Sequence, residues 1–420
     1  MGLVIETPLP RLGDTTGARR PFAERRRARN LGVAYVVLAV VTAVFLTGHS
    51  GSAIFKLDAG RSFSLPAQTT AWVAAVMFAI LAGGAFVRGY GKLTNAILAL
   101  VTVTLLMTFL AWSAAGTSFS FIGVLVSTIG YSTPIVIGAM SGIMCERSGI
   151  VNIAIEGLLL NGAFMAVFIG SITTFWVGVL AAILSSALLA WLLAWLAIRF
   201  KVDQVIVGFF INFFVLGLTN FLSKRFFTEH PNWNYVGTLR PLKIWGLHSI
   251  PVIGPIFFEQ TMYVYIAVLL VLALTWLLFR SRWGLRTRSV GEHPRAADTL
   301  GINVIRLRYR NVIMAGGVAG FGGSWFASNI GQFNQNMTAG RGFIALAVVI
   351  VGRWHPIGAL CAALVFGLFD SLGNKLATLH TGIPGEFISM LPYLATIIVV
   401  CGFVGRSRGP KAAGQPYESQ

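Results

Sequence analysis

Long apolar segments separated by short polar ones run along almost the whole chain. A helix that crosses a bilayer needs about 20 apolar residues, or fewer if it is broken. We identify about twelve such segments: 31–48, 69–88, 93–114, 120–143, 150–170, 175–199, 204–223, 261–280, 309–328, 342–353, 356–375 and 387–404. The segment 342–353 is short enough to be a half-helix that turns back, so about 10–12 spans are expected. The pattern predicts an all-α, polytopic helical membrane protein.

Lys and Arg residues gather between the apolar segments, and cytoplasmic loops carry an excess of these residues. With both termini in the cytoplasm, every basic cluster except Lys224 and Arg225 falls on the cytoplasmic side. The outer loops are then 49–68 and 224–260. We expect three parts: a basic cytoplasmic tail over 1–30 that contacts lipid, a transmembrane domain over 31–404 with a cytoplasmic loop at 281–308, and a cytoplasmic tail over 405–420.

Composition supports lipid as the solvent of most of the chain. Hydrophobic residues make up 56% and charged residues only 11%, with a mean hydropathy of +0.76. A soluble fold carries about 25% charged residues. The net charge is +18, but the charges form short clusters rather than a basic stripe, so nucleic-acid binding is not expected. Cys145, Cys361 and Cys401 are too far apart in sequence to indicate a disulfide framework or a metal site.

Motifs for chemistry are missing from the sequence. Gly91-Lys92 is followed by Leu93, without the Ser or Thr of a phosphate-binding loop. No nucleophile motif, metalloprotease motif or carboxylate pair is found. Thirty mostly polar residues before the first apolar segment argue against a cleavable signal peptide. We therefore expect no enzyme, no metal and no cofactor, and any ATP must be bound by another subunit.

Polar residues interrupt one strongly apolar stretch, from Met144 to Phe164. Polar groups at membrane depth are costly and mark functional sites by default. A cytoplasmic turn is expected at Glu146, Arg147 and Ser148. Three further polar residues of this stretch either line a pathway or form hydrogen bonds between helices: Asn152, Glu156 and Asn161.

The stretch from Arg280 to Arg310 is a long basic loop. Pro294 suits the first turn of a short helix that ends at Gly301. This helix is either part of a linker that lies on lipid or a coupling helix that docks on a motor subunit. In the apolar segment that follows, Gly316 and Gly320 have the spacing that lets helices pack closely.

Four stretches resemble, in order and with similar spacing, motifs of the membrane permeases of bacterial sugar and nucleoside ABC importers, a group that includes branched-chain amino-acid permeases. They are ERSGIVNIAIEGLLLNGAF (146–164), VDQVIVGFFINFFVLGLTNFL (202–222), VGEHPRAADTLGINVIRLRY (290–309) and GRGFIALAVVIVGRWHPIGAL (340–360). The resemblance covers about residues 93–405. Gln204 stands where the family has an acidic residue, and Arg295 where acidic or polar residues are commoner, which weakens any assignment of specific charge pairs.

The resemblance implies a permease subunit of the bacterial cytoplasmic membrane that works by alternating access. Its partners would be a second homologous permease, an ATP-binding-cassette ATPase and an extracytoplasmic binding lipoprotein. The stretches 149–164 and 290–301 resemble the nucleoside branch, so nucleosides are favoured over simple sugars. The alternative is an ion-coupled secondary transporter, with Glu156 and Asp370 as the coupling acids.

The resemblance also assigns roles to residues. The coupling element would contain Glu292, Pro294, Ala296, Ala297 and Gly301. We expect the substrate pathway to include Asn152, Glu156, Asn161 and Asn212.

Overall fold

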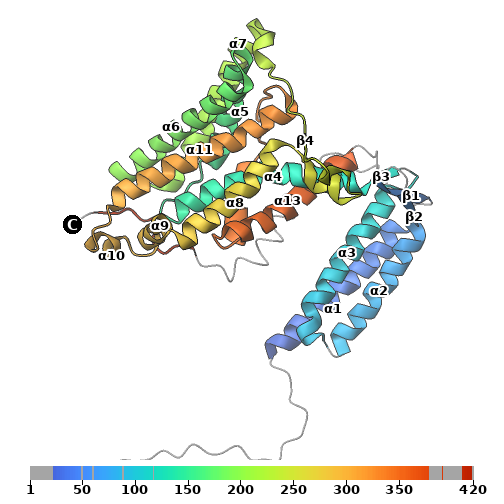
Figure 1. Ribbon diagram of the computed structural model, residues 1–420. Helices are drawn as coiled ribbons and strands as arrows, with labels where there is room; N and C mark the ends of the chain where they lie inside the picture. Colours follow the sequence, from blue (N-terminus) through green and yellow to red (C-terminus); the bar gives the residue numbers. More distant parts are fainter. Residues whose placement is uncertain are drawn as a thin grey trace, which may run out of the picture. The chain divides into compact units, whose positions relative to one another are not determined.

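The computed structural model describes residues 22–48, 51–58, 61–87, 89–116, 118–377, 390 and 409–418. The chain divides into two compact units, Met1–Phe119 and Ser120–Gln420, and each is described by itself (Figure 1). The predicted span at 387–404 lies almost entirely outside the described residues.

The first unit is a bundle of three helices with a small sheet at one end (Figure 1). The helices are α1 (Phe22–Val41), which continues as a π-helical turn (Thr42–Leu46), α2 (Ala67–Val87) and α3 (Thr94–Ser113). A single 3-10 turn, Gly91–Leu93, precedes α3. Tyr35, Phe78 and Val101 meet in the core of this bundle.

The sheet of the first unit was not expected from the sequence, which indicated only a loop at 49–68. Strand β1 (Ser52–Asp58) pairs antiparallel with β2 (Arg61–Pro66), and β3 (Ser118–Ser120) joins the other edge of β1. The Phe55 ring is fully buried, stacks on Phe63 at 5.1 Å and meets the edge of Phe119 at 5.4 Å. These aromatic contacts give the short hairpin a core of its own.

The second unit contains ten helices within the described residues. They are α4 (Phe121–Glu146), α5 (Ile155–Ile172), α6 (Phe175–Arg199), α7 (Gln204–Glu229), α8 (Met262–Arg280), α9 (Arg282–Glu292), α10 (Pro294–Thr299), α11 (Val304–Ile330), α12 (Arg341–Val351) and α13 (Pro356–Ala377). The loop between α7 and α8 contains the short turns Pro231–Asn234, Leu247–Ser249 and Gly254–Phe258 and the two-residue strands β4 (Leu242–Lys243) and β5 (Glu259–Gln260).

Eight of the described helices are long and apolar enough to cross a membrane: α2 to α8 and α13. Helix α11 has 27 residues but is rich in glycine and serine and so is less apolar. Two shorter apolar segments, Ala28–Val44 and Arg341–Val351, match further predicted spans. The prediction of an all-α, polytopic membrane protein is therefore confirmed, with short strands added to it.

Helix α12 is a half-helix, as its short apolar segment indicated. Its 11 residues rise about 16 Å at 1.5 Å per residue, roughly half of a hydrocarbon core of about 30 Å. A turn at Gly352–His355 then leads directly into α13.

Helices α5, α6 and α11 form the most closely packed part of the second unit, and glycines allow it. A Cβ atom on Gly320 would lie 2.7 Å from the Ser186 Cβ of α6, and one on Gly162 of α5 would lie 2.8 Å from the Gly320 Cα. A Cβ on Gly316 would lie 2.7 Å from the Ser186 carbonyl oxygen. Membrane helices gain their mutual attraction from such close approach rather than from water exclusion.

Replacing Gly320 by Leu should force α11 away from α5 and α6 and lower the stability of the second unit by about 1–3 kcal/mol. Gly217→Leu on α7 is the matched control, because nothing lies within 4 Å of a Cβ at that position. The midpoint of thermal unfolding in detergent measures the stability of both variants. Equal midpoints for Gly320→Leu and wild type would contradict the packing described above.

Candidate functional site

The first candidate region is the irregular segment between α4 and α5, residues 147–154. Most of its residues are buried, so its backbone polar groups need partners within the protein. The Arg147 side chain donates from Nε and Nη2 to the Trp354 carbonyl, at 3.1 and 3.0 Å. Gln204 of α7 accepts the Val151 N–H at 2.7 Å, and Arg308 of α11 donates from Nε to the Ser148 carbonyl at 3.2 Å.

Asn212 of α7 holds the end of this segment against α5. Its Oδ1 accepts the Gly157 N–H at 2.7 Å, and its Nδ2 donates to the Ile153 carbonyl at 2.9 Å. The fully buried Asn152 accepts the Ala154 N–H at 3.1 Å, and its Nδ2 has no hydrogen-bond partner within the described residues. The amide side chains thus replace the helix bonds that the segment lacks.

Asn161 lies farther along α5 and faces α6. Its Nδ2 donates to the hydroxyls of Ser185 and Ser186 at 2.8 and 3.0 Å. The Ser186 hydroxyl donates in turn to the Leu158 carbonyl at 3.0 Å. The side chain of Asn161 is therefore engaged in hydrogen bonds between two helices.

Glu156 joins two helix N-termini. It lies in the first turn of α5, and its carboxylate reaches the start of the half-helix α12. Oε1 accepts from the Thr338 hydroxyl at 2.6 Å and the Gly340 N–H at 2.9 Å, and Oε2 accepts from the Gly342 N–H at 2.6 Å. The positive ends of two helix dipoles meet this one negative charge. Because Glu156 is only 8% exposed, the arrangement binds α12 to α5 in the interior.

An ion pair that the sequence did not indicate lies beside this cluster. Arg341, the first residue of α12, donates from Nε to Oδ2 of Asp370 in α13 at 3.0 Å, and its guanidinium lies 5.9 Å from the Phe326 ring centroid. Sequence analysis named Asp370 only as a candidate coupling acid of a secondary transporter. The pairing could not be predicted because the 28 residues between the partners include a turn whose direction no pattern gives.

The four predicted pathway residues therefore lie around the start of α5, where Asn152, Glu156 and Asn212 come together and Asn161 is directed to α6. The side chains of Glu156, Asn161 and Asn212 bond one helix to another, whereas Asn152 bonds within its own segment. Their role toward a solute stays a prediction.

The second candidate region is formed by α9 and α10, at one end of the second unit. The short helix predicted to start at Pro294 and end at Gly301 is present as α10, and Gly301 adopts the left-handed φ of 79°. Helix α9 was not predicted. Ala297 is buried between Val290 and Val304, whereas Ala296 is exposed. Of the two predicted coupling alanines, only Ala296 is therefore accessible on the surface.

A C-terminal strap, which we define as Gly409–Glu418, crosses this region. The Ala412 N–H donates to the Gly291 carbonyl at 2.9 Å, and Arg308 Nη1 donates to the Gln415 carbonyl at 3.3 Å. The Tyr417 hydroxyl donates to Oδ2 of Asp298 in α10 at 2.6 Å. Lys201, between α6 and α7, forms an ion pair with Glu418. The strap therefore connects α9 and α10 to the ends of the membrane helices.

The Tyr417 phenol remains a hydrogen-bond donor at physiological pH. Burial, followed by the hydrogen bond to Asp298 and its charge, raises the pKa of Tyr417 to about 12. The link between strap and α10 is therefore insensitive to ordinary changes in pH.

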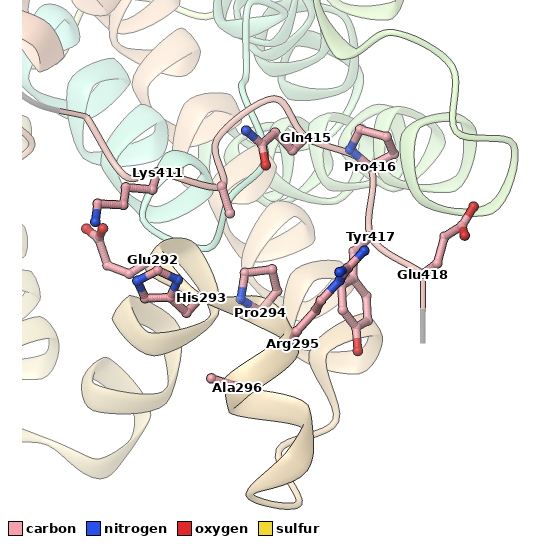
Figure 2. A pocket seen from close by; sticks show the side chains of 11 residues that line it. Glu292, His293, Pro294, Arg295, Ala296, Lys411, Gln415, Pro416, Tyr417 and Glu418 are labelled. Carbon is pink, nitrogen blue, oxygen red and sulfur yellow. The ribbon is translucent and has the colours of Figure 1, made fainter. Parts of the chain in front are cut away.

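A groove of about 620 Å³ lies between α10 and the strap (Figure 2). Figure 2 shows the side chains of Glu292 and Lys411 directed toward one another at one end of it. The residues that line it are Glu292, His293, Pro294, Arg295, Ala296, Lys411, Ala412, Gln415, Pro416, Tyr417 and Glu418. Acidic and basic side chains both border the groove. Such a mixture is better suited to binding the surface of a protein partner than to binding a small ion of one charge.

Replacing Glu156 by Ala should leave the buried donors of Thr338, Gly340 and Gly342 without an acceptor, at a cost of about 1–3 kcal/mol for each unsatisfied group. The thermal midpoint in detergent should fall accordingly. Glu229→Gln is the control, because Glu229 forms an exposed pair with Arg225 that contributes little. Wild-type stability together with lost solute uptake in Glu156→Ala would instead place the carboxylate in the solute pathway.

Comparison with known proteins adds to this geometry. Residues 124–400 match the family described as branched-chain amino acid transport system / permease component. The match begins just after the start of α4 and leaves the first unit out, so it starts later than the motif resemblance indicated. No solved structure matches the chain.

The sequence of this chain aligns with three known proteins over almost their whole length. The chain is 42% identical over 302 residues to the guanosine ABC transporter permease protein NupQ of Bacillus subtilis, covering 69% of this chain and 95% of the relative. It is 38% identical over 303 residues to the nucleoside ABC transporter permease protein NupC of Lactococcus lactis subsp. cremoris, covering 68% and 94%. It is 31% identical over 311 residues to the putative glucose ABC transporter permease protein TsgC13 of Haloferax volcanii, covering 69% and 94%.

The family match extends over more than half of the chain, and it includes the α4–α5 break, the half-helix α12 and the α9–α10 region. The protein therefore belongs to the family of branched-chain amino acid transport system permease components.

Proposed function

We propose that this protein is the membrane-spanning permease subunit of an ABC importer for nucleosides. The observation that carries the proposal is the 42% identity to a guanosine permease across 95% of that relative. Identity to the glucose relative is lower, at 31%, which supports nucleosides over sugars. The importer would act in the bacterial cytoplasmic membrane, with a second homologous permease and an extracytoplasmic binding lipoprotein.

The α9–α10 region and the strap form the surface on which the ATPase subunit docks. Arg295 and Ala296 are exposed, and Leu300 at the end of α10 is 82% exposed. An apolar side chain next to a charged groove fits a protein partner better than a lipid surface. ATP binds to that partner, because no phosphate-binding loop is found in this sequence. The face that carries α9 and α10 is then the cytoplasmic face.

Movement of α10 reaches the membrane helices through direct contacts. A Cβ on Gly291 would lie 2.9 Å from the carbonyl carbon of Arg147, so α9 rests on the start of the α4–α5 break. Arg308 links the same break to the strap through its bonds to Ser148 and Gln415. When the ATPase closes, it favours one of two arrangements of these helices only if it contacts α10 differently in each. That difference drives alternating access.

An ion-coupled secondary transporter is the alternative. It requires acids at membrane depth that can take up and release an ion. Asp370 is paired with Arg341, and the Glu156 carboxylate accepts three hydrogen bonds from the protein. Both acids are engaged in structural contacts, which supports the hypothesis of an ATP-driven importer over that of an ion-coupled transporter.

Cells that carry the gene should take up labelled guanosine and uridine, and deletion of the gene should abolish this uptake. Depletion of ATP should stop uptake, whereas an uncoupler applied at maintained ATP should leave it intact. Labelled ribose and glucose serve as controls. Uptake that survives ATP depletion and stops with the uncoupler would establish the secondary transporter instead.

Leu300→Asp should lower uptake at least about tenfold and reduce co-purification of the ATPase, because the side chain is available to a partner. The fold should be unaffected, since Leu300 is 82% exposed. Trp245→Asp is the control: Trp245 is 97% exposed but lies in the loop between α7 and α8. Undiminished co-purification of the ATPase with Leu300→Asp would exclude this docking surface.

A further inference from the structure

A pocket of about 290 Å³ that combines apolar surface with several polar side chains lies between α4 and α13. Helix α4 contributes Ser120, Gly123, Val124, Ser127 and Tyr131 from its start, at the i, i+3, i+4, i+7 and i+11 spacing of one helix face. Helix α13 contributes Ser371, Asn374 and Lys375 from its end. None of these residues belongs to the pathway set predicted from the sequence.

Two kinds of polar group line the pocket. Some are used by the fold: the Ser120 hydroxyl accepts the Gly123 N–H at 3.0 Å, and the Ser371 hydroxyl donates to the Val124 carbonyl at 2.9 Å. Others have no hydrogen bond within the described residues, namely the hydroxyls of Ser127 and Tyr131. The Asn374 amide nitrogen donates to the Asp370 carbonyl at 2.8 Å, so the amide oxygen of this pocket-lining residue is not used in that bond.

Hydroxyls without partners are expensive on a lipid-facing surface and are expected where a membrane helix borders water or a solute. The Tyr131 ring adds a flat apolar surface, held in place by an edge contact with Trp325 at a centroid distance of 6.5 Å. A pocket of this volume lies near the lower end of the range of about 300–1,000 Å³ for small-molecule sites. It suits a single small molecule with hydroxyls and a planar ring.

The pocket lies far from the α9–α10 region. Tyr131 precedes the last residue of α4 by 15 residues, a rise of about 22 Å, and Ser371 follows the first residue of α13 by the same number. The ends of α4 and α13 that are remote from the pocket meet α9 and the Gly352–His355 turn. The pocket is therefore at the end of the second unit opposite to the proposed ATPase surface.

We infer that the α4–α13 pocket is the site at which the permease first receives its solute from outside the membrane. This inference rests on the proposed function and deepens it. The Tyr131 ring stacks on the nucleobase. The hydroxyls of Tyr131 and Ser127 and the Asn374 amide oxygen form hydrogen bonds with the sugar hydroxyls or the base edge.

Uptake of labelled guanosine by the whole importer in cells tests the pocket. Ser127→Trp fills it and should reduce uptake at least tenfold at low guanosine concentration, with normal membrane insertion and ATPase co-purification. Tyr131→Phe keeps the ring and should raise the KM up to about tenfold, the effect of one lost hydrogen bond, whereas Tyr131→Leu should raise it further. Val365→Trp is the matched control, because Val365 lies on α13 away from the pocket and is 42% exposed.

A second measurement does not depend on transport. Ser127→Cys should react with a membrane-impermeant thiol reagent added from outside, beyond the labelling of the parent chain, and guanosine should protect it whereas glucose should not. Wild-type uptake and KM in Ser127→Trp, or labelling that guanosine does not slow, would overturn the site. If the wild-type importer takes up no nucleoside at all, the proposed function fails, and this outcome is separate because it is seen before any variant is compared.

Discussion

The second unit depends on one constraint: where a buried helix is interrupted, its free backbone groups must find partners within the protein. Two interruptions meet here, the segment 147–154 before α5 and the start of the half-helix α12. Glu156 accepts from the backbone at the start of α12, and Asn212 bonds the backbone at the start of α5. Both polar side chains act as substitutes for helix hydrogen bonds, so the broken helices and the buried polar residues require one another.

The same arrangement connects the membrane interior to the α9–α10 region. Arg147 and Arg308 each bond to a backbone carbonyl in or next to the turns at this end of the unit. The strap lies across these turns and links α9, α10 and α11. Short, direct contacts therefore link α10 to the α4–α5 break, as the proposed coupling role of α10 requires.

The first unit stands apart from the family core. The family match begins at residue 124, after the end of the first unit, and the three relatives are covered to 94–95% of their own length by about 69% of this chain. Its three helices and buried Phe55 give it a core of its own. It is an addition to a permease core that is otherwise shared with these relatives.

The sequence by itself determined the membrane class, the positions of the long apolar helices, the short apolar segment at 342–353 and the short helix after Pro294, because apolar length, glycine and proline act locally. It also located Asn152, Glu156 and Asn161 as unusual polar residues in apolar surroundings. Only the tertiary structure decided what their side chains bind, paired Arg341 with Asp370, and brought the strap to α10. The hairpin at 52–66 and the α4–α13 pocket likewise depend on contacts between segments that are distant in sequence or on aromatic packing. Periodicity along one segment carries no information about which other segment lies against it.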